Sequence, residues 1–68
     1  MFYEIIATSK ATKMEQIADV IPNDEFEAER MVIEWLLALG PAYSVDSRKA
    51  AGEMPQDFKS PLQDVRIG

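Results

Sequence analysis

The sequence predicts a small α+β protein, a small antiparallel sheet with one packed helix in the order ββαβ, and three observations support this fold class. Residues 2 to 8, FYEIIAT, are rich in the aromatic and β-branched side chains that favour strands. Residues 24 to 39, DEFEAERMVIEWLLAL, have the end signals and the apolar content of a helix. Residues 42 to 48, AYSVDSR, alternate in the way typical of a half-buried strand.

The segment between the first strand and the helix fits two structures. Residues 16 to 21 can return as a second strand that ends at Pro22. The alternative is a short helix over residues 13 to 20, because four apolar residues recur there at helical spacing, namely Met14, Ile17, Ala18 and Ile21. We favour the strand, since a terminal strand needs a neighbour and a hairpin supplies one without a crossover. A helix would instead give a strand followed by a helical hairpin.

Both ends of the main helix are marked. Asp24, followed three residues later by Glu27, fits a capping box in which Asp24 accepts an N–H of the first turn and Glu27 reaches back. Gly40 and Pro41 mark the end, because glycine adopts a left-handed cap at low cost and proline cannot continue the helical hydrogen bonds.

This helix has more apolar surface than one sheet can cover. Glu27, Arg30, Glu34 and Ala38 share one narrow face. The apolar side chains occupy roughly two-thirds of the circumference, and they are Phe26, Ala28, Met31, Val32, Ile33, Trp35, Leu36, Leu37 and Leu39. A surface helix on a sheet needs an apolar arc only a little over about 100° wide. The rest of the chain, a second copy or another protein must therefore cover the excess.

The chain divides into a single ββαβ domain over residues 1 to 52 and an irregular C-terminal segment or tail over residues 53 to 68. If Phe58 and Leu62 lie against the helix, they cover part of its excess apolar arc. With 68 residues and no cysteine, a marginal core must gain stability from good packing or from association.

The side chains on which most catalysis depends are missing. The chain has no histidine and no cysteine, so the common general bases, nucleophile pairs and metal ligands are absent, and we expect no enzyme, no metal and no cofactor. The glycines stand alone at positions 40, 52 and 68, which excludes a glycine-rich phosphate loop. Its seven lysine and arginine residues are scattered, so direct binding to nucleic acid is not expected.

Two further features of the sequence bear on the cellular compartment of the protein. The longest apolar run, residues 31 to 39, is interrupted by Glu34 and is far shorter than the roughly 20 residues of a membrane-spanning helix. The start, MFYEIIA, has Glu4 and no basic residue before its apolar run, which argues against a cleaved secretory signal. We therefore expect a cytoplasmic protein.

Negative charge is concentrated in the first half of the chain. Residues 1 to 39 hold eight acids and three bases, a net charge of −5, whereas residues 40 to 68 hold four of each. Four of the acids begin the helix, namely Asp24, Glu25, Glu27 and Glu29. They complement the helix dipole and favour solubility, and they also suit a partner with a basic groove, such as one built to hold nucleic acid.

Binding is therefore the predicted function, through an apolar contact on the helix. The candidate contact residues are Met31, Val32, Trp35, Leu36 and Leu39, with the four acids steering association. For Trp35 a place in the core is the simpler interpretation, because an aromatic residue on a helix of a small protein is usually buried. The alternative to an outside partner is a homodimer, structural or adaptor in role, whose helices pair across a two-fold axis.

The order strand, strand, acidic-capped helix, strand, with Glu34 and Trp35 in the helix and GPAYSV at residues 40 to 45, resembles compact phage-encoded inhibitors of type I CRISPR complexes. The resemblance covers residues 2 to 48 and rests on element order and on the helix-to-strand junction. It implies a non-enzymatic, anti-CRISPR-like protein of a phage or mobile element. Such a protein acts in the host cytoplasm by docking on a basic nucleic-acid-handling surface and blocking it.

Overall fold

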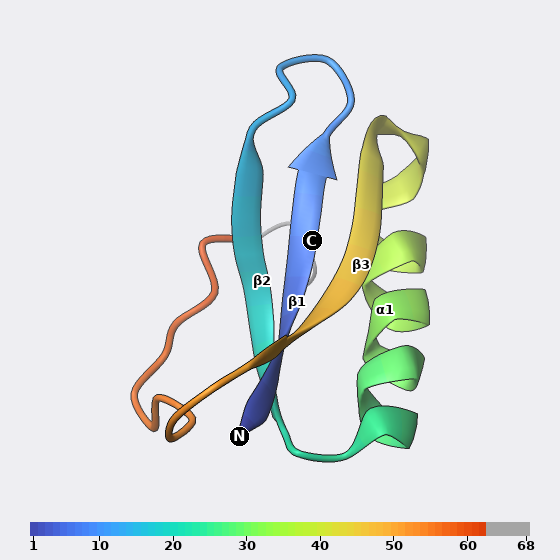
Figure 1. The fold of residues 1–68 in the computed structure, drawn as a ribbon. Coiled ribbons are helices and arrows are strands. Elements are labelled where there is room, and N and C mark those ends of the chain that lie inside the picture. Colours follow the sequence, from blue (N-terminus) through green and yellow to red (C-terminus); the bar gives the residue numbers. More distant parts are fainter. Residues whose placement is uncertain (63–68) are drawn as a thin grey trace.

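The computed structural model describes residues 1–62 and has the predicted order ββαβ (Figure 1). Its elements are strand β1 (Phe2–Ser9), strand β2 (Glu15–Pro22), helix α1 (Glu25–Leu39), a 3-10 turn (Gly40–Ala42) and strand β3 (Tyr43–Ala50). The strands form one sheet in the order β2-β1-β3, antiparallel at both pairings. The α+β prediction is therefore confirmed.

Residues 15 to 22 are a strand, so the short helix considered for this segment is wrong. The hairpin turn before it is closed by two backbone bonds: the Ser9 N–H donates to the Met14 carbonyl at 3.0 Å, and the Lys13 N–H donates to the Ser9 carbonyl at 2.8 Å. Lys13 adopts a φ of 64°, the left-handed conformation that a tight turn needs.

A β-bulge interrupts the pairing of β1 with β2. Ile5 pairs with Asp19 and Ile6 pairs with Ile17, which leaves Ala18 as the extra residue. Such a bulge re-aims the neighbouring side chains. Ala18 is completely buried in the core beneath α1, and Asp19 accepts a hydrogen bond from the Trp35 indole at 3.4 Å.

Helix α1 begins and ends at the predicted residues, but its caps differ from the predicted ones in two respects. Asp24 Oδ1 accepts the Glu27 N–H at 3.2 Å, as a capping residue does. The Glu27 carboxylate, however, pairs with Arg30 one turn further on, so the reciprocal half of the capping box does not form. At the other end Gly40 has φ 78° and ψ −167°, which is not the predicted left-handed cap but another conformation almost confined to glycine, and its N–H donates to the Leu36 carbonyl.

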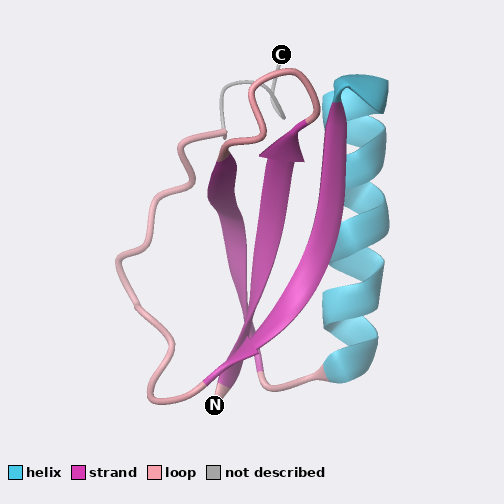
Figure 2. Ribbon diagram, turned by 45° about the horizontal axis from the view of Figure 1, so that its top comes forward, coloured by secondary structure: helices cyan, strands magenta, loops and turns pink. Residues whose placement is uncertain are grey.

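One face of the sheet is covered by α1, which lies against β3 and β1 more closely than against β2 (Figure 2). The described part of the C-terminal segment runs back beside β2 (orange in Figure 1). Its Leu62 is buried and joins the core under the helix. The residues of this core are Ile5, Ala7, Ala18, Ile21, Ala28, Met31, Trp35 and Leu62. The burial of Leu62 favours the cover over the tail, which the sequence left open, whereas Phe58 is only half-buried and is not part of this core. Residues 63 to 68 lie outside the described residues.

The cap geometry predicts a measurable loss of stability in the Asp24→Ala variant. Removing the acceptor leaves the Glu27 N–H to water and should lower the free energy of unfolding by about 1 kcal/mol. Asp24→Asn is the matched control, because asparagine retains an acceptor oxygen and should keep most of the stability. Urea denaturation followed by circular dichroism measures both. Equal losses in the two variants would show that the charge of Asp24, and not its hydrogen bond, stabilises the helix.

Candidate protein-binding surface on the outer face of α1

Three large apolar side chains form a row on the solvent side of α1. Phe26 is 79% exposed, Ile33 is 58% exposed and Leu37 is 80% exposed. At 100° per residue they lie within about 40° of one another, almost opposite the residues that α1 buries. Leu36, 39% exposed, adjoins this row. We call Phe26, Ile33 and Leu37 the outer row.

A shallow groove interrupts the outer row near the start of α1. It is lined by Phe26, Glu29, Arg30 and Ile33, four residues at positions i, i+3, i+4 and i+7. Its exposed lining is mainly apolar, because the stems of Glu29 and Arg30 line it together with the two hydrophobic side chains. The groove is therefore a place where an apolar side chain of another molecule can leave water.

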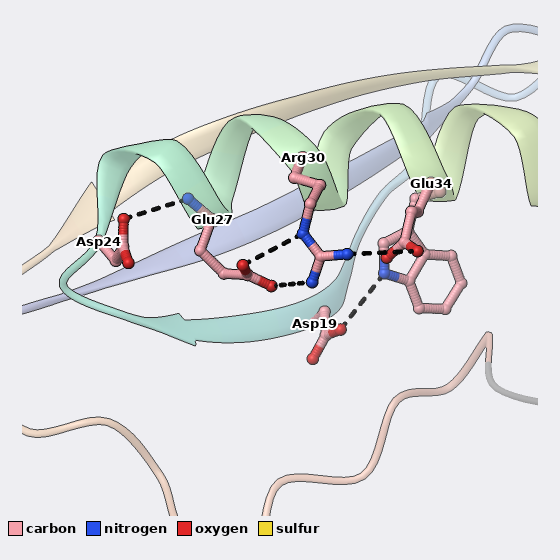
Figure 3. A network of polar contacts seen from close by, with 6 residues as sticks. Asp19, Asp24, Glu27, Arg30 and Glu34 are labelled. Atoms are coloured by element: carbon pink, nitrogen blue, oxygen red, sulfur yellow. Dashed lines mark hydrogen bonds and ion pairs between the residues drawn. The ribbon is translucent and has the colours of Figure 1, made fainter.

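An ion-pair network lies on the flank of α1 that faces β2 (Figure 3). Arg30 Nε donates to Glu27 Oε2 at 3.2 Å, and Arg30 Nη1 lies 3.8 Å from Glu34 Oε1. The hydrogen bond with Glu27, together with the charges of Glu27 and then of Glu34, raises the pKa of Arg30 above its ordinary value. Because these groups are exposed, the network adds little to stability. It does, however, neutralise the positive charge nearest to the outer row.

Residues 24 to 39 remain strongly acidic after this pairing. They contain five acids against one arginine, a net charge of −4. Glu25 and Glu29 are exposed on the flank opposite the ion-pair network, so the outer row has carboxylates on both sides. An apolar row bordered in this way favours a partner whose own apolar contact is bordered by bases.

The structure corrects the predicted apolar contact. Trp35 is completely buried and Met31 is 7% exposed, so a partner cannot reach either side chain in this fold. Val32 and Leu39 are half-buried against the core. Of the five predicted apolar contact residues, Leu36 alone has substantial exposure.

Each of the four predicted steering acids lies at the start of α1, but two of them have structural partners. Asp24 caps the helix and Glu27 pairs with Arg30. Glu25 and Glu29 project into solvent. The outer row was missed because an apolar arc of two-thirds of the circumference does not say which half meets the sheet. If the narrow face of Glu27, Arg30 and Glu34 is placed beside the sheet contact, at a flank of the helix, one part of the apolar arc meets the sheet and the other faces solvent. That placement would have identified the outer row.

The second face of the sheet offers a different surface. Arg48 of β3 donates to Glu4 of β1 at 3.0 Å. A shallow groove beside this pair is lined mainly by hydroxyl and charged groups, together with Ile6 and Val45. Phe2 and Ile6 are buried there and do not project. Among residues 1–62, the exposed large apolar side chains gather mainly on α1.

Within the described chain, no group of three or more histidine, cysteine, aspartate or glutamate side chains is arranged to hold a metal ion. No helix in residues 1–62 has both the length and the apolar character needed to cross a membrane.

Comparison with protein-family models, with curated proteins and with solved structures finds no match.

Proposed function

We propose that this protein is a small acidic protein-binding module without catalytic activity, and that it contacts its partner through the outer row of α1. The observation that supports the proposal is the exposure of Phe26, Ile33 and Leu37 on one line of a helix whose core side is already filled. Burying a side chain of this size contributes about 1.5–3 kcal/mol. Three such side chains in one row can thus provide the centre of an interface.

The negative charge of the chain supports a partner with a basic surface. The chain has a net charge of −5, most of it around α1, and acidic surfaces speed association with basic ones. We therefore propose a protein with a basic surface, of the kind that holds nucleic acid, as the partner. Inhibition of a nucleic-acid-handling complex in the host cytoplasm by a phage or mobile-element protein is the specific form of this proposal. The ββαβ order and the acidic helix start support it.

A homodimer is the second candidate, because the outer row of one copy could pack against that of another. It would bury the same three side chains. Its weakness is electrostatic: two copies would bring the acids that border one row against those that border the other, and like charges oppose such a contact.

Site-specific photo-crosslinking tests the proposal. A benzoylphenylalanine placed at Ile33 should form an adduct with a different protein in cells that produce the chain. The same group at Met14, which is 65% exposed on the hairpin turn, is the matched control and should not. A second change, Leu37→Asp, should remove the adduct, because it places a charge in the contact. An adduct of twice the chain mass would establish the homodimer, and equal adducts at positions 33 and 14 would contradict both candidates.

A further inference from the structure

We infer that the outer row receives a basic amphipathic α-helix, laid antiparallel to α1, with one aliphatic side chain in the groove between Phe26 and Ile33. This inference rests on the proposed function, because it takes the outer row as the contact surface. It adds the secondary structure, the charge and the direction of the segment that binds there.

The geometry of the groove favours a helix as its occupant. Phe26, Glu29, Arg30 and Ile33 stand at i, i+3, i+4 and i+7, the four positions that surround one inserted side chain when two helices pack knobs-into-holes. The row continues to Leu37, eleven residues beyond Phe26, which corresponds to about 16 Å along the axis. A second helix can follow this line for three turns at the usual separation of about 8–10 Å.

An extended peptide fits this surface less well. Extended ligands gain affinity from backbone hydrogen bonds to a sheet edge. The backbone groups of α1 are used within the helix, so the outer row offers side chains only. Packing between side chains is what a helical ligand provides.

The flanking charges require bases on that helix. Glu25 and Glu29 lie on one side of the row, and Glu27 and Glu34 lie on the other with Arg30 between them. A ligand helix with lysine or arginine on both sides of an apolar seam would face carboxylates along its length. An acidic ligand, a second copy of this chain included, would meet like charge on both sides.

The distribution of the acids along α1 sets the direction. They are densest in residues 24 to 29, at the start of the helix, where no base is present. Basic residues are most favourable in the last turn of a helix, where they complement its dipole. The basic C-terminal end of the ligand should therefore lie beside the start of α1, which makes the two helices antiparallel.

Three synthetic peptides test the inference. All are fluorescein-labelled, helix-forming and built on the same leucine seam. The first has lysines on both flanks, denser towards its C-terminal end, the second has the same lysines denser towards its N-terminal end, and the third has glutamates in place of lysines. Fluorescence anisotropy should show the first peptide binding at least tenfold more tightly than the second, with no saturable binding of the third. Higher salt should weaken binding of the first.

Variants of the protein make the test specific to the groove. Ile33→Asp should abolish binding of the first peptide and leave the circular dichroism spectrum unchanged, because the side chain is 58% exposed. Met14→Asp is the control with the same change of charge, and it should bind as the unmodified chain does. Equal affinity for the two lysine peptides, or equal affinity for the glutamate peptide, would overturn the inference.

Failure of the inference can be told apart from failure of the proposed function. If no peptide binds but the crosslink at position 33 still forms, the outer row is a contact surface for a partner that is not a basic helix. If neither is observed, the outer row is not the contact surface and both fail.

Discussion

Trp35→Ala should leave the chain largely unfolded at 25 °C. Trp35 is completely buried, and its indole N–H donates to Asp19 across the gap between α1 and β2. Truncating a buried tryptophan to alanine costs about 3–5 kcal/mol. A single hydrophobic core in a chain of 68 residues rarely supplies more than about 3–5 kcal/mol, so this loss is comparable to the whole stability. Far-UV circular dichroism and urea denaturation would show the loss of both structure and cooperativity.

Two control variants separate the contribution of the buried ring from that of the indole hydrogen bond and from the effect of any substitution in α1. Trp35→Phe keeps most of the ring volume but loses the donor to Asp19, so its free energy of unfolding should fall between those of the alanine variant and the unmodified chain. Ile33→Ala shortens an exposed side chain of the same helix and should change the stability by less than about 0.5 kcal/mol. A folded Trp35→Ala variant that had lost only its partner would contradict the buried position and restore Trp35 as a contact residue.

Strands β1 and β3 and the helix could be predicted because each has a local physical cause, whereas β2 was inferred from the need of β1 for a neighbour. Aromatic and β-branched residues mark β1, alternation marks β3, and Asp24 with Gly40 marks the ends of α1. Strand β2 was ambiguous for a reason that the structure reveals. The bulge at Ala18 breaks the two-residue alternation, so Ala18 and Ile21 face the core three residues apart. That spacing is also the spacing of a helix.

The candidate site was harder to predict than the fold. The apolar residues of α1 outnumber those that the sheet can cover, and periodicity alone does not decide which of them stay outside. Which apolar residues stay outside depends on tertiary packing. The Trp35 side chain points from the helix to Asp19 beside the bulge, and Ala28 is buried in the same core. Once these two residues face the sheet, Phe26, Ile33 and Leu37 must face solvent.

The C-terminal segment is the other part that local patterns could not place. Within the described residues it forms no helix or strand after Ala50, and its glycine and prolines gave no reason to prefer a cover over a tail. What fixes its place is the position of α1, which leaves the β2 side of the sheet less covered. Leu62 joins the core on that account, although it is twelve residues beyond the last strand.

Leu62→Ala should therefore destabilise the protein by about 2–4 kcal/mol, within the range measured for buried leucines. The residue is 5% exposed and belongs to the same core as Trp35, so its truncation leaves a cavity in that core or admits water to it. Leu37→Ala is the matched control, because it is the same substitution at a side chain that is 80% exposed, and it should cost less than about 0.5 kcal/mol. Urea denaturation followed by Trp35 fluorescence measures the two variants.

The pair of variants also separates stability from binding. Leu62 is buried in the core and Leu37 lies on the solvent side of α1, so one substitution should change the stability alone and the other the affinity alone. Leu62→Ala should lower the urea midpoint and leave the affinity of the folded protein for the basic helical peptide unchanged. Leu37→Ala should keep the midpoint and weaken that affinity. If Leu62→Ala left the midpoint unchanged, residues 53 to 62 would be a tail that the core does not need, and the domain would end at residue 52.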